Sequence, residues 1–390
     1  MPQGFKVSAV SAGLKKNGKK DLALIVSEAP AAVAGVFTRN RVQAAPVVLD
    51  RQRLQQGVCR AIIANSGNAN CCTGKKGMED AVSMTGAVSD ALGIEPEHVM
   101  AASTGVIGEP LKIGAVLAAV PELIGGLSYD CFEVAAQAIM TTDTRPKLVT
   151  RQGEINGEAY TVTAVAKGAG MIRPDMATML CFICADLGID AEDLQEALHY
   201  ANERSFNRIT IDGDTSTNDT VLAMANSCSG ARVTTRDHRE AFAGLLAEML
   251  ESLAKMIVAD GEGATKCVEV RVKNAATEKD ARRIADTVAN SNLVKTAFSG
   301  EDANWGRIIA AAGRSGAEFD PERTDIWFDS VRMVKNGAGC GADAEAAATG
   351  VLKQSEFCVT IDAKQGSGEA SVLTCDFSVD YVKINADYRS

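Results

Sequence analysis

A glycine-rich segment interrupted by a proline brings a small residue and a hydroxyl residue to the start of an apolar run. It begins at Lys167 and continues Gly-Ala-Gly-Met-Ile-Arg-Pro-Asp-Met before reaching Ala177 and Thr178. The apolar run that follows, through Ala185, is typical of a fully buried strand. A β-branched residue at the first position of a strand is also common for purely structural reasons. The segment alone therefore leaves two interpretations of Thr178 open, a strand start and a nucleophile.

A threonine hydroxyl needs a base before it can act as a nucleophile, and histidine is scarce in this chain. Its three histidines, His98, His199 and His238, stand in helix-like or charged contexts without a companion. One base that a threonine can acquire is its own α-amino group, freed when the preceding peptide bond is cut. Such an amine has a pKa of about 7.7–8.0, so a good fraction can accept the hydroxyl proton near neutral pH. We predict an acyl shift from nitrogen to oxygen at Ala177–Thr178, then ester hydrolysis, which yields the chains 1–177 and 178–390.

The cysteines do not predict a metal or redox centre. There are eleven, spread over the whole length, which is typical of reduced, mostly buried thiols rather than of a disulfide framework. Cys181 and Cys184 form a Cys-x-x-Cys, but positions i and i+3 of a strand face opposite sides of the sheet. No second pair and no nearby histidine completes a zinc set. We interpret the adjacent Cys71 and Cys72 as packing residues, and predict no metal and no bound organic cofactor.

The composition is that of an ordinary globular protein. Of 390 residues, 46% are apolar, 23% charged and 5% aromatic, with a mean hydropathy near zero. Fifty acidic against forty basic residues give a net charge of −10, so we expect no nucleic-acid partner. Several lysines precede any apolar run of signal-sequence length, and no run reaches about 20 apolar residues. We therefore expect a cytoplasmic protein without a membrane partner.

Strand-like and helix-like stretches alternate, which predicts a mixed α/β class with helices covering the faces of mixed sheets. Asn156-Gly157 is a strong hairpin signal between the strand-like stretches 147–151 and 159–165. Short apolar runs bounded by turn residues predict further strands at 22–26, 32–37, 47–49, 61–64, 268–272, 326–331, 358–361 and 370–384. Apolar residues at helical spacing predict helices at 79–92, 111–123, 131–140, 191–204, 236–258, 278–289 and 305–312.

Polar and glycine residues gather in short segments that follow strand-like or helix-like stretches, where loops carry functional residues on a rigid scaffold. Any one of them could be a mere turn, because Gly, Asn, Asp and Thr are ordinary turn formers. Their glycine spacing matches no nucleotide-binding motif. The segments are Asn65–Asn70, Ser103–Gly105, Thr141–Thr144, Lys167–Gly170, Asp212–Asp219 and Asp260–Gly263.

Taken together, these segments closely resemble the ornithine acetyltransferase family, the ArgJ-type glutamate N-acetyltransferases of arginine biosynthesis. The resemblance covers nearly the whole chain, with many separate motifs in register. They are Asn65-Ser-Gly-Asn-Ala-Asn70, Ser103-Thr-Gly-Val-Ile-Gly108, Met140-Thr-Thr-Asp-Thr144, Lys167-Gly-Ala-Gly-Met171, Met176-Ala-Thr-Met-Leu180, Asp212-Gly-Asp-Thr-Ser-Thr-Asn-Asp219, Leu293-Val-Lys-Thr-Ala297, Asn304-Trp-Gly-Arg307 and Asn385-Ala-Asp-Tyr-Arg-Ser390.

The resemblance implies a DmpA/ArgJ-like fold of mixed sheets covered by helices, self-cleaved before Thr178 into two interlocked chains. These chains would stay together as a heterotetramer with two copies of each. It also implies ping-pong chemistry: Thr178 takes acetyl from N-acetylornithine, releasing ornithine, and passes it to glutamate, giving N-acetylglutamate. Some family members also use acetyl-CoA as donor, and both kinds share these motifs, so this co-substrate stays open.

The resemblance further implies roles for individual residues. Thr104 and Gly105 would form the oxyanion hole, where one donor contributes about 3 kcal/mol to the transition state. Lys167 would hold a carboxylate or an oxyanion, and Glu262 an ammonium group. Asn385 and Ser390 would bind substrate only if the C-terminus is ordered and folds back over the site. The implied substrate-binding set is Thr141, Lys167, Thr178, Glu262, Asn385 and Ser390.

Three positions depart from the family pattern, which more often has serine at Ala169, asparagine at Asp175 and threonine at Ser390. Ser390 keeps the hydroxyl, whereas Asp175 lies two residues before the scissile bond and could alter the rate of self-cleavage. Two other functions stay open. One is a self-processing aminopeptidase or amidohydrolase of the related fold, in which water resolves the acyl-enzyme. The other is a non-catalytic binding protein in which Thr178 merely starts a strand.

Overall fold

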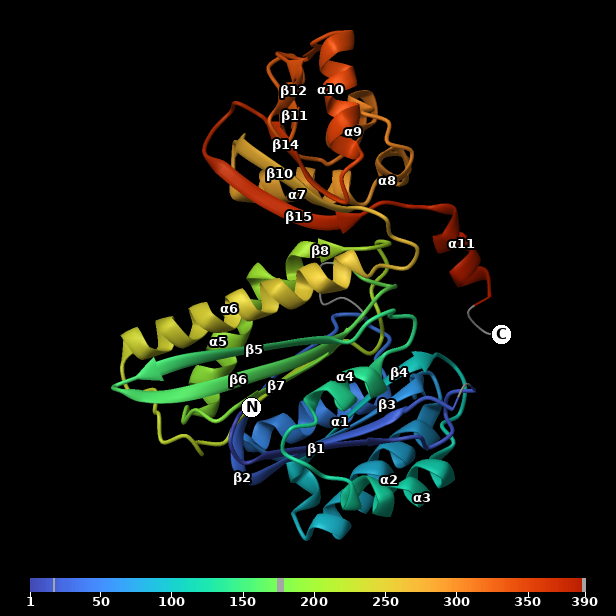
Figure 1. The fold of residues 1–390 in the computed structure, drawn as a ribbon, viewed down its shortest axis with the longest axis vertical. Helices are drawn as coiled ribbons and strands as arrows, with labels where there is room; N and C mark the ends of the chain where they lie inside the picture. Colours follow the sequence, from blue (N-terminus) through green and yellow to red (C-terminus); the bar gives the residue numbers. More distant parts are fainter. Residues whose placement is uncertain (17, 174–178, 388–390) are drawn as a thin grey trace. The chain divides into compact units, whose positions relative to one another are not determined.

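The computed structural model describes residues 1–16, 18–173 and 179–387. The chain divides into two compact units (Figure 1). The first comprises Met1–Asn207 and Asp214–Ile257, and the second Arg208–Gly213 and Val258–Ser390. Each unit has its own mixed sheet with helices packed on it, which confirms the predicted mixed α/β class.

The first unit is built on an eight-stranded sheet that bends along one long strand. That strand, β2 (Leu22–Phe37), pairs with β1 and β3 in its first part and with β9 in its last part. The register of the β2–β3 pair shifts between Val26 and Ala31, and the pairing with β9 begins at Ala32. The strand order is β4-β3-β2-β9-β7-β6-β5, with β1 also beside β2. The other strands are β1 (Phe5–Val10), β3 (Val58–Asn68), β4 (Val99–Val106), β5 (Lys147–Ile155), β6 (Glu158–Lys167), β7 (Leu180–Ala185) and β9 (Thr220–Ala225).

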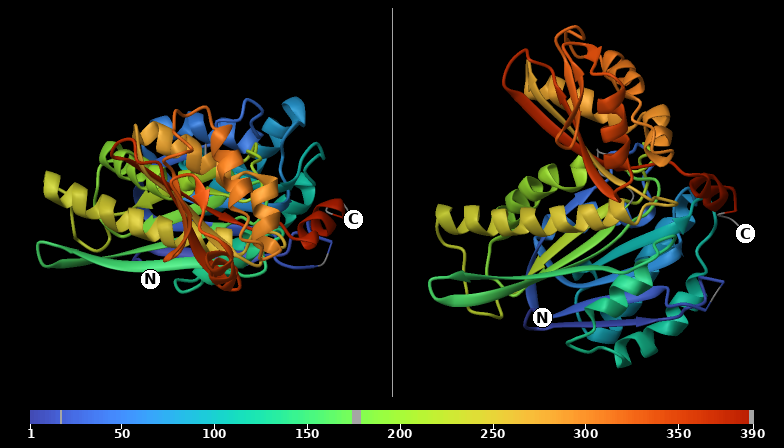
Figure 2. Two further views of the ribbon diagram at one scale, coloured as in Figure 1. Left: turned by 90° about the horizontal axis from the view of Figure 1, so that it is seen from above. Right: turned by 45° about the horizontal axis from the view of Figure 1, so that its top comes forward.

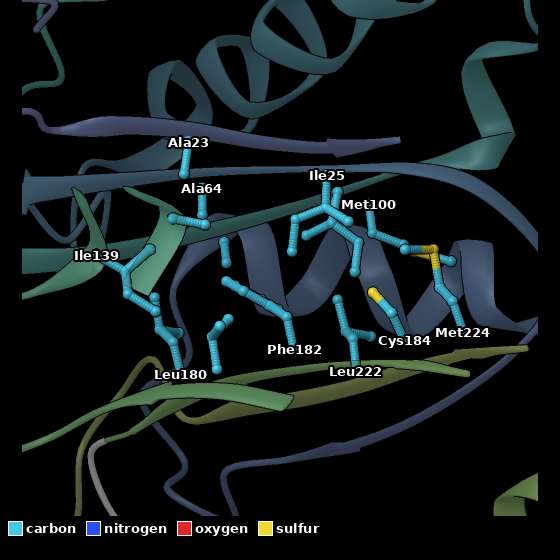
Figure 3. Close-up of a cluster of buried hydrophobic side chains, with 14 of the residues drawn as sticks. Ala23, Ile25, Ala64, Met100, Ile139, Leu180, Phe182, Cys184, Leu222 and Met224 are labelled. Atoms are coloured by element: carbon cyan, nitrogen blue, oxygen red, sulfur yellow. The ribbon is translucent and has the colours of Figure 1, made fainter. Parts of the chain in front are cut away.

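The bend makes two layers, and the main core of the unit fills the space between them (Figure 3). Side chains of β7 and β9 face those of β2, β3 and β4 across this space. Every residue of β7 is buried, which confirms the prediction of a fully buried strand after Thr178. The facing residues are Ala23, Ile25, Ala64 and Met100 on one layer, and Leu180, Phe182, Cys184, Leu222 and Met224 on the other.

Helices cover the outer faces of both layers in the first unit (Figures 1 and 2). The helices α2 (Gly74–Leu92) and α3 (Ile113–Gly125) pack in a second apolar cluster with β1, β3 and β4. The helices α5 (Ala191–Arg204) and α6 (Arg236–Ala259) cover the other layer, where Phe242 meets Tyr160 edge to face with ring centroids 6.2 Å apart. Two shorter helices, α1 (Ala45–Arg53) and α4 (Phe132–Ile139), supply side chains to the core between the layers.

The second unit has a seven-stranded sheet, ordered β13-β12-β11-β14-β10-β15-β8. Its central strand β10 alternates buried valines with more exposed charged residues, as predicted for a half-buried strand. Four of its helices pack on the buried side in one apolar cluster, whereas the helix Val379–Ala386 has no buried residue. The strands are β8 (Ile209–Thr210), β10 (Cys267–Ala275), β11 (Asp325–Phe328), β12 (Val331–Lys335), β13 (Ala338–Gly339), β14 (Glu356–Asp362) and β15 (Gly368–Cys375); the helices are α7 (Glu278–Ala289), α8 (Asn292–Ser299), α9 (Trp305–Gly313), α10 (Ala342–Leu352) and α11 (Val379–Ala386).

Three strand predictions were wrong. Residues 326–331 do not form one strand, because Asp329 and Ser330 form the turn between β11 and β12. Residues 47–49 lie in α1, because Pro46 occupies its first turn, where a proline favours a helix start. Residues 370–384 do not form one strand: β15 ends at Cys375, and Ser378 caps α11 by accepting a hydrogen bond from the Asp380 amide at 3.2 Å. Three short 3₁₀ helices, Leu54–Gln56, Pro96–His98 and Phe206–Arg208, complete the secondary structure. Within the described residues, no helix combines the length and apolarity needed to cross a bilayer.

Candidate active site

Thr104 and Gly105 lie near the end of β4, in direct backbone contact with β3. The register places Thr104 beside Ser66 and Gly105 beside Gly67. Both glycines have positive φ, 92° at Gly67 and 135° at Gly105, and a Cβ on Gly105 would lie 2.3 Å from the carbonyl carbon of Gly67. Only glycine fits these two positions without moving the backbone. The two strand ends therefore hold the predicted oxyanion pair against the Asn65–Asn70 segment.

A buried asparagine from a third polar segment joins these two strand ends. The Asn218 side-chain amide donates to the carbonyl of Ala69 at 2.7 Å and to that of Ser103 at 2.8 Å. The Ser103 hydroxyl in turn donates to Asn65 Oδ1 at 2.6 Å. Three segments that are far apart in sequence thus meet through buried hydrogen bonds. This network fixes the backbone next to Thr104 and Gly105.

The buried carboxylate of Asp143 connects the segment of Thr141 with the end of β6, which carries Lys167. Asp143 Oδ1 accepts hydrogen bonds from Lys147 Nζ at 2.6 Å and from the Gly168 amide at 2.7 Å, and its Oδ2 accepts from the Thr141 amide at 3.0 Å. Lys167 is the last residue of β6 and is 3% exposed. Two of the predicted substrate residues therefore lie around one acid. Sequence reasoning missed this role, although Asp143 was visible as the lone acid among three threonines, four residues before a lysine.

The charges around Asp143 keep it ionised. Burial by itself would raise the pKa of this carboxyl, but the charges of Lys167 and Lys147, with the hydrogen bonds from Lys147 and Gly168, lower it overall. The side chains of Asp143 and Lys147 are both fully buried, so this is an internal ion pair. Lys167 adds a second buried cation, and such a site favours an anionic ligand.

A second buried acid contacts the residue that follows Thr178. Asp219 Oδ1 accepts a hydrogen bond from the Met179 amide at 3.1 Å, and its Oδ2 has no hydrogen-bond partner in the described part of the chain. Complete burial raises the pKa of Asp219 well above its ordinary value, which favours the neutral acid. Ala177 and Thr178 lie outside the described residues, as does Asp175. Asp219 belongs to the Asp212–Asp219 motif, from which the sequence predicts no separate role for it.

In the second unit, Glu262 and Asn385 lie together. The Asn385 amide donates to Glu262 Oε2 at 2.7 Å, and Glu262 is 8% exposed. The Ser378 hydroxyl donates to the Gly263 carbonyl at 2.6 Å, so α11 begins against the turn that carries Glu262. Gly263 has a φ of 68°, and a Cβ there would lie 2.4 Å from the Tyr381 nitrogen. Ser390 lies outside the described residues.

A buried acid anchors the same turn from the other side. The Asp376 carboxylate accepts hydrogen bonds from the Thr265 amide at 2.7 Å, the Thr265 hydroxyl at 2.8 Å and the Lys266 amide at 2.8 Å. Asp376 is fully buried just after the end of β15. The segment from Asp376 to Asn385 is therefore tied to the Glu262 turn at several points, and Glu262 is held at a defined position.

The whole chain matches one protein family. The model of the ArgJ family matches residues 6–390. The chain belongs to the ArgJ family. An ArgJ relative from Geobacter sulfurreducens is 55% identical over 390 residues, covering 100% of this chain and 99% of the relative. One from Symbiobacterium thermophilum is 52% identical, covering 100% and 98%. Both are named arginine biosynthesis bifunctional protein ArgJ, so the predicted family, and with it an enzyme of arginine biosynthesis, is confirmed.

Two solved structures are also similar to this chain. A crystal structure of the arginine biosynthesis bifunctional protein ArgJ from Bacillus halodurans is 41% identical, with a TM-score of 0.50. The match covers 53% of this chain and 97% of the Bacillus halodurans chain. The ornithine acetyltransferase of Mycobacterium tuberculosis, solved in complex with ornithine, is 39% identical, with a TM-score of 0.41 over 46% of this chain and 93% of that one. The predicted ArgJ-like fold is thus confirmed over the part that the first of these covers.

Proposed function

We propose that this member of the ArgJ family is a glutamate N-acetyltransferase that moves acetyl from N2-acetyl-L-ornithine to L-glutamate. One observation carries the proposal: buried side chains of the first unit contact the segments that carry four of the predicted site residues. Asn218 joins the strand ends that carry the oxyanion pair, Asp143 joins Thr141 to the end of β6, and Asp219 holds Met179, the residue after Thr178. Thr104, Gly105, Thr141 and Lys167 are proposed in the roles that the family resemblance implies.

The first event in the proposal is self-cleavage. The Thr178 hydroxyl attacks the Ala177 carbonyl carbon, the peptide bond between them breaks, and the Thr178 nitrogen becomes a free amine. Water then hydrolyses the ester, which leaves a carboxylate on Ala177 and restores the hydroxyl of Thr178. The solved Bacillus halodurans chain supports this event. Nearly all of that chain, 97%, matches only 53% of this chain, which is the result expected if the solved chain is one fragment of a cleaved protein.

Transfer follows in two steps of the same kind. The Thr178 amine takes the hydroxyl proton, the oxygen attacks the acetyl carbonyl of N-acetylornithine, and the tetrahedral oxyanion is stabilised by Thr104 and Gly105. Collapse breaks the amide bond, and ornithine leaves with the proton from the amine. Glutamate then attacks the acetyl-threonine ester through its own amine and leaves as N-acetylglutamate, restoring the free hydroxyl. Glu262 is proposed to hold a substrate ammonium group, with Asn385 and Ser390 as further contacts.

We propose acetyl-CoA as a second acetyl donor and no bound cofactor. The relatives' shared name describes them as bifunctional, which supports a second activity. Glutamate acetylation with acetyl-CoA as the sole donor measures it directly. We also propose that the two fragments assemble as a heterotetramer, which the native mass tests. The cytoplasmic location stays a prediction.

Replacing Thr178 tests the nucleophile. Thr178→Ala lacks the attacking oxygen, so we expect one uncut chain and no transfer activity. Thr178→Ser keeps a hydroxyl and is the matched control, expected to cut and to transfer. Intact-mass spectrometry and an assay of ornithine release report the two results separately. Two fragments or transfer in Thr178→Ala would overturn the proposal, and ornithine release that does not depend on glutamate would favour the hydrolase.

A further inference from the structure

A buried aspartate fixes the loop between β1 and β2 against the end of β3. The Asp21 carboxylate accepts hydrogen bonds from the amides of Ala12 at 2.6 Å, Leu14 at 2.6 Å and Lys15 at 2.9 Å. The Ser66 amide donates to the Asp21 carbonyl at 2.8 Å. Asp21 is fully buried, so these bonds are shielded from water. The backbone of Lys15 therefore has a defined position beside the Asn65–Asn70 segment.

The Lys15 side chain runs across Gly67, the partner of Gly105. A Cβ added to Gly67 would lie 3.4 Å from Lys15 Cγ, and Gly67 pairs directly with Gly105 in the β3–β4 register. Beyond the glycine, Lys15 Nζ donates to the Lys20 carbonyl at 2.9 Å and to the Ala138 carbonyl at 3.0 Å. The Ala138 carbonyl lies in the last turn of α4, three residues before Thr141. The ammonium thus lies between the strand ends of the oxyanion pair and the segment that carries Thr141.

Hydrogen bonds fix the position of the Lys15 ammonium, but no carboxylate in the described residues neutralises its charge in an ion pair. Its two hydrogen bonds go to carbonyl groups, and it forms no ion pair with any carboxylate in the described residues. Lys147 differs, because its ammonium is paired directly with Asp143. A lysine ammonium has three N–H donors, and these two bonds use two of them. Lys15 therefore retains one donor and a net positive charge beside the predicted site.

We propose that Lys15 binds the α-carboxylate of the amino-acid substrate. The inference rests on the proposed transferase function and deepens it by adding a residue that the family motifs above do not contain. Substrates with a free α-carboxylate would be selected over their neutral carboxamides. Lys15 acts in binding rather than in the chemical step, so its loss changes KM and leaves kcat nearly unchanged.

The charges around Lys15 give the proposal a pH dependence. Burial lowers the pKa of Lys15 to about 8; Asp21 and Asp143 raise it, while Lys19 and Lys167 lower it further. A carboxylate binds the protonated lysine, so binding is complete below this pKa and is lost as the pH rises through about 8. N-acetylornithine suits the measurement because its α-amine is acetylated, and its side-chain amine stays charged up to about pH 10.

The test compares Lys15→Met with Lys15→Arg and with Lys16→Met, which removes the same charge from the exposed neighbour in the loop. We expect Lys15→Met to self-cleave, to keep kcat within about threefold, and to raise KM for N-acetylornithine about 10- to 100-fold, the value of a hydrogen bond to a charged group. Lys15→Arg should recover most of this loss, and Lys16→Met should match the wild type. The preference for N-acetylornithine over its carboxamide should vanish only in Lys15→Met.

A pH series supplies a second readout that does not depend on the methionine variant. From pH 7 to 9.5, the wild-type KM for N-acetylornithine should climb above pH 8, whereas that of Lys15→Arg should stay flat. A fall in kcat at constant KM in Lys15→Met, an unchanged carboxamide preference, or matching wild-type and arginine profiles would overturn the proposal. Wild-type protein that neither cuts itself nor transfers acetyl would instead refute the proposed function.

Discussion

A buried carboxylate is costly unless partners compensate its charge, and Asp143 has several such partners. It accepts hydrogen bonds from Lys147 Nζ and from the amides of Gly168 and Thr141, and it lies in the field of Lys167. Removing the acid removes the partner of a fully buried ammonium group. Asp143 therefore contributes to stability as well as to the arrangement of the site.

We expect Asp143→Asn to lower the free energy of unfolding by about 3–5 kcal/mol, the usual cost of breaking a buried ion pair. Because the pKa of Asp143 is lower in the folded state, its contribution is complete above the unfolded pKa of about 4 and disappears as the pH falls through the lower folded value. Urea unfolding at pH 7 and at pH 3 measures both effects. The exposed Asp90→Asn is the control, and a loss below about 1 kcal/mol at pH 7 would contradict this reading.

Among the elements, the ends of β3 and β4 tolerate the least change of side chain, because the glycines Gly67 and Gly105 pair there. Gly105 has no room for a Cβ next to the Gly67 backbone. Gly108, two residues after the end of β4, has a positive φ of 85°, but no atom lies within 4 Å of a Cβ added there. Alanine variants of Gly105 and Gly108 therefore separate the effect of a positive φ, which both positions have, from that of steric overlap, which only Gly105 has.

We expect Gly105→Ala to push the strand ends apart and to lower transfer activity at least about 100-fold, because an oxyanion donor contributes about 3 kcal/mol. Gly108→Ala should cost only about 1–2 kcal/mol of stability, from its left-handed backbone, and keep most activity. Initial rates and thermal unfolding of both variants give the comparison. If Gly105→Ala and Gly108→Ala had the same rate and the same stability, steric overlap at Gly105 would not determine activity, and the prediction would be wrong.

The elements also show what the sequence can and cannot predict. The buried strand β7 and the β5–β6 hairpin at Asn156-Gly157 follow from local patterns, and both are present, with positive φ at the two turn residues. The helix at 47–49 was missed because three apolar residues look alike in either state, and only Pro46 favours a helix. Asp219 was missed because its partner Met179 lies 40 residues away. Asp143 and Lys15 also have partners nearby in the sequence, but their contacts with Gly168 and Ala138 come from distant segments, which no local pattern reveals.

Within the first unit, the predicted cut separates strands that remain neighbours. The order β4-β3-β2-β9-β7-β6-β5 places two strands of 178–390, β9 and β7, between strands of 1–177. β7 pairs with β6 from Val162↔Ala185 to Lys167↔Leu180, and β9 pairs with β2 from Ala32↔Ala225 to Phe37↔Thr220. Neither fragment can leave without breaking both sets of hydrogen bonds and exposing the core.

We therefore expect the cut protein to stay one species in native buffer and to separate only when the sheet unfolds. Size-exclusion chromatography in native buffer and in 6 M guanidinium chloride, a denaturing concentration, tests this when each peak is run on a denaturing gel. The uncut Thr178→Ala chain is the control. Fragments that elute apart under native conditions would contradict the pairing described above.

The long strand β2 also sets an order of events during synthesis. Its last part has β9 as partner, and β9 lies more than 180 residues further along the chain. A nascent polypeptide on the ribosome therefore cannot close this sheet until residue 225 has emerged, and such distant pairing slows folding. We therefore expect the proposed self-cleavage to follow that closure, so that the two halves fold together as one polypeptide before they are divided.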